Sequence, residues 1–187
     1  DADITFLALH GSIGENGQLQ AALDCHGIRY TGSGYIGCLL SMDKDISKKL
    51  LRAAGIPTAD WKTYGIASCT ADEIIADIGI PCVIKPCSCG SSIGVSLVKS
   101  EAELSDALAL AAGYESAVMA EKFITGREFS IGVLDGSALA PVEIIPKAGF
   151  YDYKNKYQSG LTTELCPAPL TEEENRRLAD AALAVHK

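Results

Sequence analysis

The chain has 187 residues, of which 48% are hydrophobic and 21% are charged, and its formal net charge is −8. This length allows one large domain or two small ones with a buried core. The acidic balance argues against a nucleic-acid surface, which needs clustered Lys and Arg, and no apolar run approaches the ~20 residues that span a bilayer.

Seven cysteines are spread along the chain without the paired spacing of a zinc site. Several lie in apolar runs, where Cys behaves as a small hydrophobic residue. We therefore expect free thiols, no metal ligands among these residues, and a reducing cytoplasmic location.

The first 54 residues predict a buried strand, Ile4–Leu9, followed by a glycine-rich turn and three helices. A helix that begins after such a turn can hold a carboxylate or phosphate at its N-terminus, and His10 could face that anion. A hydrogen-bonding role for His10 at the strand end would be equally simple. Lys44 opens the third helix, where the helix dipole disfavours a cation, so it could serve a ligand. The helices are expected at about 17–26, 36–42 and 43–54, the last with a buried stripe of Ile46, Leu50, Leu51 and Ala54.

The stretch 61–112 predicts a compact α+β lobe in the order strand, helix, strand, loop, strand, helix. Capping boxes at Thr70 and Ser100 mark the starts of its two helices. The loop, residues 89–94, consists of small residues whose N–H and hydroxyl groups suit phosphate oxygens, and Lys85 at its mouth could add a cation. A surface hairpin with an ordinary lysine fits this loop equally well when the loop is taken alone.

Residues 117–145 predict a three-stranded antiparallel meander. Glu121, Glu128 and Glu143 lie within its strands, where Glu is disfavoured without a partner, although solvent-facing positions would also explain them. Residues 150–157, FYDYKNKY, are too aromatic for a passive loop and too polar for a core strand. A third capping box at Thr171 opens a long amphipathic helix.

Five segments, in this order and at these separations, resemble the D-alanine–D-alanine ligase family of peptidoglycan precursor synthesis. They are LHGSIGENGQLQAAL, YTGSG with MDK, VIKP with GSSIGVSLV, EKFITGREF and FYDYKNKY. The resemblance covers nearly the whole chain and implies an α/β and α+β architecture with an ATP-grasp fold, in which two α+β lobes surround the nucleotide. It implies three parts: the end of an N-terminal Rossmann-like α/β domain (1–42), a central lobe (43–120) and a C-terminal lobe (121–187).

The resemblance implies phosphate contacts in the central lobe. Lys44 and Lys85 resemble the lysines that hold the α- and β-phosphates of ATP. Gly90, Ser91 and Ser92 lie in the loop that covers the phosphates.

The resemblance also implies an adenosine site at the start of the C-terminal lobe. Glu121, Lys122 and Ile124 match the strand that reads adenine, Ile124 through its backbone N–H. Glu128 matches the acid that binds the ribose hydroxyls.

For D-alanine, the resemblance implies a histidine beside the first substrate at His10 and a serine of the substrate hydrogen-bond network at Ser91. Lys156 matches the lysine at the γ-phosphate. Tyr151 and Tyr157 belong to the ω-loop that closes the site, and a tyrosine at the position of Tyr157 is typical of D-alanine as second substrate.

The implied reaction forms an acyl phosphate and then lets an amine displace the phosphate, so it needs charge neutralisation and water exclusion rather than a side-chain nucleophile. The resemblance implies Mg²⁺ and a homodimer. We expect the metal ligands beyond the last residue, a substrate-binding glutamate before the first, and no ligase turnover from this piece alone. Cys87-Ser88-Cys89 departs from the family, which usually has a charged residue there, and its thiols could make the loop sensitive to oxidation.

Two alternatives remain open at this point. The first is a D-alanine–D-serine ligase or another ATP-grasp carboxylate–amine ligase, which would use the same lysines and loop. The second is a truncated, inactive nucleotide-binding module. We expect small-molecule partners, D-alanine and ATP, and neither nucleic acid nor membrane.

Overall fold

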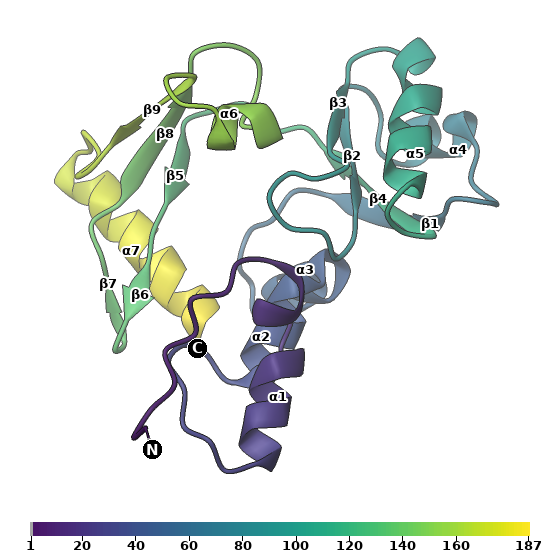
Figure 1. The fold of residues 1–187 in the computed structure, drawn as a ribbon. Coiled ribbons are helices and arrows are strands. Elements are labelled where there is room, and N and C mark those ends of the chain that lie inside the picture. Colours follow the sequence, from purple (N-terminus) through teal and green to yellow (C-terminus); the bar gives the residue numbers. More distant parts are fainter. Residues whose placement is uncertain (1) are drawn as a thin grey trace. The chain divides into compact units, whose positions relative to one another are not determined.

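The computed structural model describes residues 2–187, and the chain divides into two compact units (Figure 1). The first unit combines the residues up to Leu50 with Asp60–Phe123, and the second combines Leu51–Ala59 with Ile124–Lys187. The division into 1–42, 43–120 and 121–187 stays a prediction. No helix within residues 2–187 is both long and apolar enough to cross a bilayer.

The first unit holds most of the helices and a four-stranded antiparallel sheet with the strand order β1-β4-β2-β3. Its elements, of which α3 ends in the second unit, are η1 (Ser12–Gly14), α1 (Gln18–Cys25), α2 (Tyr35–Met42), α3 (Lys44–Ala53), β1 (Trp61–Gly65), α4 (Ala71–Asp77), β2 (Cys82–Pro86), β3 (Ser96–Val98), η2 (Glu101–Glu103), α5 (Leu104–Ala112) and β4 (Ala117–Lys122).

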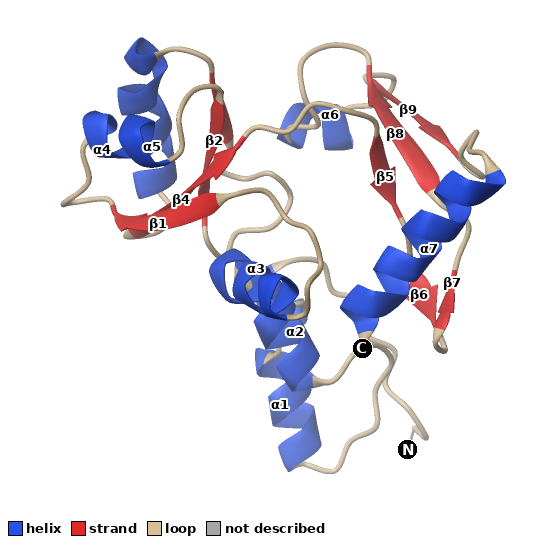
Figure 2. Ribbon diagram, turned by 180° about the vertical axis from the view of Figure 1, so that it is seen from behind, coloured by secondary structure: helices blue, strands red, loops and turns tan. Residues whose placement is uncertain are grey.

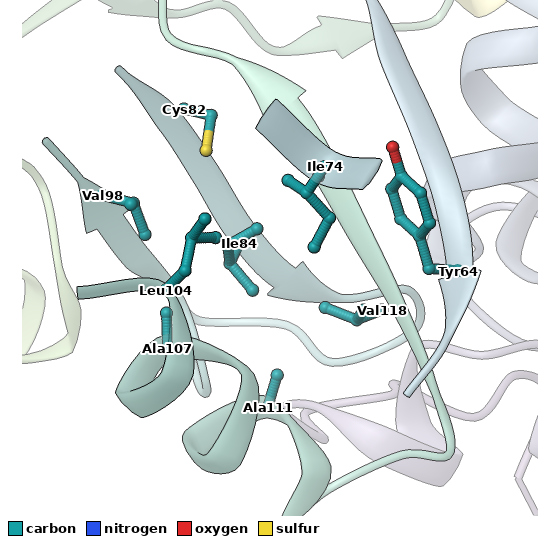
Figure 3. Packing of buried hydrophobic residues seen from close by; sticks show 10 residues of the cluster. Tyr64, Ile74, Cys82, Ile84, Val98, Leu104, Ala107, Ala111 and Val118 are labelled. Carbon is teal, nitrogen blue, oxygen red and sulfur yellow. The ribbon is translucent and has the colours of Figure 1, made fainter. Parts of the chain in front are cut away.

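The hydrophobic core lies between one face of this sheet and helices α4 and α5, which lie together beside the strands (Figure 2). Ile74 of α4 and Leu104 of α5 are fully buried against Ile84 of β2 and Val118 of β4 (Figure 3). This arrangement confirms the predicted order of strand, helix, strand, loop, strand and helix. Because side chains alternate along a strand, the neighbours of these core residues face the other side of the sheet.

The other face of the sheet meets α3. Asp45 accepts hydrogen bonds from Trp61 Nε1 at 2.9 Å and from Thr63 Oγ1 at 3.2 Å. Lys48 is buried, whereas Ile46 and Leu50 are exposed. The predicted apolar stripe of this helix was therefore wrong, because α3 packs on polar partners offered by the sheet.

The start of the chain also differs from the prediction. The expected buried strand Ile4–Leu9 is reduced to a single parallel bridge between Thr5 and Tyr30, and Phe6 is 77% exposed. A strand is stabilised by its neighbours in a sheet, and within residues 2–187 this segment pairs with one residue only. The three helices that follow are confirmed.

The second unit contains a three-stranded antiparallel sheet, β5-β8-β9, and a separate β6-β7 hairpin. Its elements are β5 (Glu128–Ser130), β6 (Val133–Leu134), β7 (Ser137–Ala138), β8 (Val142–Pro146), α6 (Tyr153–Tyr157), β9 (Thr162–Leu165) and α7 (Glu172–His186).

The predicted meander was wrong in one strand. β4, which was expected beside residues 128–134, pairs instead with β1 and β2 in the first unit. The predicted pairing of the other two strands is found between β5 and β8, and β9 adds a third strand on the other side of β8. Val118, Met119 and Ala120 are all fully buried, which is the pattern of a strand covered on both faces at the centre of a sheet.

Two of the three capping boxes are confirmed. The Thr70 and Thr171 hydroxyls accept from the backbone N–H three residues later, and the side chains of Glu73 and Glu174 accept from the backbone N–H of Thr70 and Thr171. Ser100 makes no such bond with its side chain, and a 3₁₀ turn leads into α5 instead. A 3₁₀ turn already bonds the Glu103 N–H to the Ser100 carbonyl, at 3.1 Å, and so occupies the donor that the box would use.

Candidate functional site

Two lysines share one carboxylate on the α3-facing side of the first sheet. Glu121 of β4 accepts from Lys85 of β2 and from Lys48 of α3. The side chains are 15%, 17% and 8% exposed respectively. Burial by itself raises the pKa of Glu121, but the two lysines outweigh burial and hold the pKa of Glu121 below its usual value. Lys48, Lys85 and Glu121 thus form a largely buried cluster with a net charge of +1.

Lys44 supplies a third ammonium group, which lies beside the loop that joins β2 to β3, residues 87–95. Its Nζ donates to the carbonyl of Cys89 at 2.6 Å and of Cys87 at 3.3 Å, and its backbone N–H donates to Cys87 O at 2.9 Å. Burial lowers the pKa of Lys44, and the nearby charge of Lys85 lowers it further. Lys44 and Lys85 therefore share one electrostatic environment, where a bound anion would favour the charged form of Lys44.

The β2–β3 loop turns sharply at its centre. Ser91 and Ser92 have φ values of 53° and 57°, and Gly94 has φ 69°. Within this turn the Ile93 N–H donates to Gly90 O at 3.0 Å, and successive N–H groups in a turn conformation can form an anion-binding concavity. A Cβ on Gly94 would lie 2.7 Å from Pro86 Cγ, so the loop returns tightly against the end of β2.

His10 reaches this loop from the first segment of the chain. Its Nε2 lies 3.4 Å from Ser91 Oγ. His10, Ser91, Lys44 and Lys85 all lie in the first unit. Their roles toward a substrate stay predictions.

The end of β4 carries two more of the predicted residues. The Glu121 side chain lies between the lysines, while the Lys122 side chain is exposed and its N–H donates to Asp60 O at 2.8 Å. Ile124 follows in the second unit and is 66% exposed. A contact of any of these residues with adenine stays a prediction.

The second unit holds the other predicted group on its own sheet. Glu128 of β5 and Glu164 of β9 both pair with Ile144 of β8, so their side chains lie on the same face. Burial raises the pKa of Glu128, and Lys156 opposes that rise. The Tyr151 hydroxyl donates to Glu164 at 3.4 Å.

Aromatic contacts shape the segment above that face. Lys156 Nζ lies 5.0 Å from the centre of the Tyr151 ring, and the Tyr153 and Tyr157 rings are 4.8 Å apart. Asp152 caps α6 by accepting from Asn155 N at 2.7 Å. The aromatic segment, residues 150–157, thus contains a short capped helix and is not an extended loop.

Sequence reasoning missed two residues of the first unit. Lys48 lies four residues after Lys44, on the same side of α3, and that spacing was a usable signal. Glu115 lies between α5 and β4 and accepts from the backbone of Cys87 and Ser88. A single acidic residue in an expected loop, such as Glu115, gives no indication in the sequence that it contacts residues 87 and 88.

The loop thiols have raised pKa values. Burial, followed by Glu115, raises the pKa of Cys87 to about 11, and burial, followed by the hydrogen bond to Glu115, raises the pKa of Cys89. The thiolate is the reactive form of cysteine, so these values disfavour the oxidation-sensitive loop that the sequence suggested.

Known proteins are similar to this chain in sequence and in structure. The family described as D-ala D-ala ligase C-terminus matches residues 50–187. The D-alanine–D-alanine ligase of Anaeromyxobacter dehalogenans (strain 2CP-C) is 41% identical over 99% of this chain and 60% of its own length. The chain thus spans about three-fifths of the curated relatives that it matches.

Solved structures agree with that result over all of this chain. A D-alanine–D-alanine ligase from Bacillus anthracis has a TM-score of 0.87 at 39% identity, with 61% of its length covered. The complex of the Bacillus anthracis ligase with ATP has a TM-score of 0.83 at 36% identity, with 60% covered. The VanG D-Ala:D-Ser ligase from Enterococcus faecalis has a TM-score of 0.85 at 32% identity, with 56% covered. These likenesses confirm the predicted ATP-grasp architecture.

Proposed function

Since this chain belongs to the D-alanine–D-alanine ligase family, we propose that it is part of an enzyme that uses ATP to join two D-alanines into D-alanyl-D-alanine. The product would serve peptidoglycan precursor synthesis in the cytoplasm, and the active form would be a homodimer. The observation that carries the proposal is the position of Lys44, which donates to Cys89 O of the β2–β3 loop and feels the charge of Lys85 in the strand that leads into that loop.

The proposed reaction has two steps. A carboxylate oxygen of the first D-alanine attacks the γ-phosphorus of ATP, and the bond to ADP breaks. The amine of the second D-alanine then attacks the carbonyl carbon of the acyl phosphate, inorganic phosphate leaves, and the amine loses a proton.

The residues of this chain suit that reaction because phosphoryl transfer relies on positioning and charge neutralisation. Lys44 and Lys85 would neutralise the α- and β-phosphates, and Lys156 would neutralise the γ-phosphate. The N–H groups of the β2–β3 loop, with Ser91 and Ser92, would cover the phosphates.

The remaining assignments follow the resemblance residue by residue. Glu121, Lys122 and Ile124 would read the adenine, and Glu128 would bind the ribose hydroxyls. His10 would lie beside the first D-alanine.

The aromatic segment would exclude water. An acyl phosphate hydrolyses readily, and closing an active site prevents such side reactions. Tyr151 and Tyr157 would supply that closure through rings that already pack with Lys156 and Tyr153.

The described residues include no cluster that suits a magnesium ion. Within residues 2–187, no group of three or more His, Cys, Asp or Glu side chains could hold a metal ion. The family implies Mg²⁺, but no step of the proposed reaction is assigned to metal ligands of this chain.

Calorimetry with a non-hydrolysable ATP analogue tests the nucleotide site in the 187-residue chain. We expect measurable binding that falls about 10- to 100-fold in Lys85→Ala, which is the size of one lost charge-assisted hydrogen bond. Binding that is unchanged in Lys85→Ala would remove the phosphate role of this lysine. Absence of binding in the unaltered chain would contradict the nucleotide site as a whole.

A D-alanine–D-serine ligase is the second candidate, since the VanG D-Ala:D-Ser ligase is similar over the whole chain. Tyr157 within FYDYKNKY favours D-alanine instead. Phosphate release with D-alanine, D-serine or D-lactate as second substrate, measured for this sequence in a chain of the relatives' full length, separates the candidates. A product dominated by D-alanyl-D-serine would refute the preferred assignment.

A further inference from the structure

The carboxylate of Glu115 gathers the donors at the start of the β2–β3 loop. It accepts from Cys87 N at 2.9 Å, Ser88 N at 3.0 Å and Ser88 Oγ at 2.6 Å, and the Cys89 thiol lies 3.4 Å away. Burial opposes the charge of Glu115, but the donors of Ser88 outweigh burial and lower the pKa of Glu115. The carboxylate is therefore ionised at neutral pH, and hydrogen bonds to an ionised acceptor are the stronger kind.

Lys44 binds two of these three residues, Cys87 and Cys89, through their carbonyl groups. Its Nζ donates to the carbonyls of Cys87 and Cys89, and its N–H donates to Cys87 O. The segment 87–89 thus has the Glu115 anion on the N–H groups of Cys87 and Ser88, and the Lys44 cation on the carbonyls of Cys87 and Cys89. Such a segment has few backbone conformations left to it, because each change breaks a charge-assisted bond on one side or the other.

We propose that Glu115 is a positioning residue for the nucleotide phosphates, because it fixes the backbone of residues 87–89 and so aims the Lys44 ammonium. This inference rests on the proposed function, which assigns Lys44 to the phosphates. Glu115 itself touches no phosphate in this scheme. The left-handed residues of the loop, Ser91, Ser92 and Gly94, follow the segment 87–89 that Glu115 and Lys44 hold.

The inference gives Cys89 a role that its departure from the family pattern left open. A protonated thiol is a weak donor, and the Cys89 thiol lies within reach of Glu115. Cys89 therefore completes the carboxylate's set of donors instead of acting as a nucleophile.

The test compares Glu115→Gln and Ser88→Ala with Glu103→Gln in the 187-residue chain. Glu103 is a matched control, because its carboxylate also accepts from a backbone N–H, that of Lys99 at 2.7 Å. We expect affinity for a non-hydrolysable ATP analogue to fall about tenfold in Glu115→Gln, with adenosine affinity measured by competition unchanged. Loss of a negative charge near Lys44 would by itself strengthen the binding of an anion, so weaker binding reports positioning. Affinity that stays equal or rises would overturn the proposal.

A second measurement keeps the test independent of the nucleotide. Labelling of Cys89 by iodoacetamide, followed by mass spectrometry of its peptide, should be faster in Glu115→Gln and Ser88→Ala than in the unaltered chain. Equal labelling rates in the variants and the unaltered chain would refute the proposal that Glu115 fixes residues 87–89. If the unaltered chain binds no analogue, the proposed function fails, while the labelling still decides whether Glu115 holds residues 87–89.

Discussion

Replacing Glu121 by Gln should destabilise the first unit strongly. The substitution leaves the ammonium groups of Lys48 and Lys85, which are 8% and 17% exposed, without their shared counterion. Removing one partner of a buried ion pair costs about 3–5 kcal/mol, and the remaining exposure reduces this to about 2–4 kcal/mol of unfolding free energy. Two cations that lose one anion also repel each other, which adds to the cost.

Urea denaturation, followed by tryptophan fluorescence, measures the loss of unfolding free energy in the first unit of the structure. Trp61 is the one tryptophan of the sequence and lies in β1, with its ring centre 4.9 Å from Lys48 Nζ, so its fluorescence reports on the first unit. Glu101→Gln removes the same charge from an exposed position in η2 and is the control. We expect the control to change stability by no more than about 0.5 kcal/mol.

The pH dependence supplies the refuting result. The folded-state pKa of Glu121 is lowered, so its stabilisation is present above the unfolded-state value and is lost as pH falls through the folded value. The difference between the unaltered chain and Glu121→Gln should therefore shrink as pH falls below the ordinary value of 4.5. A difference below about 1 kcal/mol at pH 7, or one that persists unchanged in acid, would refute the reasoning.

Three further substitutions test the loop, the core and a cap. Gly94→Ala should lower the unfolding free energy by about 1–3 kcal/mol, because Gly94 has φ 69° and an added Cβ would meet Pro86. Gly90→Ala, whose added Cβ has its nearest atom at 3.9 Å, should lower it by less than about 1 kcal/mol. Equal unfolding free energies for the two variants would contradict this. Ile84→Ala should lower the midpoint of urea unfolding by removing about 2–5 kcal/mol, since Ile84 is fully buried, and a change below about 1 kcal/mol would show that the core is loosely packed. Thr171→Ala should cost about 1 kcal/mol in thermal unfolding followed by circular dichroism, and no change would mean that the cap of α7 is dispensable.

Local sequence patterns predicted the elements that depend on a few neighbouring residues. The Thr70 and Thr171 boxes began helices because the cap, the acid and the apolar stripe all lie within one or two turns. The segment between β2 and β3 was predicted as a loop because its glycines and serines neither pack nor pair well. The strand Ile4–Leu9 failed because an apolar run indicates burial without saying which neighbour provides it.

Contacts between distant residues were beyond such reasoning. Lys48 could have been suspected from its spacing to Lys44, but its partner Glu121 lies 73 residues away. Glu115 and Ser88 are 27 residues apart and meet only because β2 and β4 are adjacent in the sheet. β9 was missed because β8 has two neighbours, β5 and β9, and the residues of a strand do not show how many strands pair with it.

The sequence by itself determined the family, the helix starts and the residue types of the site, because motifs in fixed order and caps of three or four residues are local information. Only the tertiary structure decided which acid neutralises which lysine. The strand order β1-β4-β2-β3 places Glu121 beside Lys85, and α3 brings Lys48 to the same carboxylate. Strand order and helix placement arise from burial summed over the whole unit, and this arrangement, not spacing in the sequence, decides which charges lie close enough to pair.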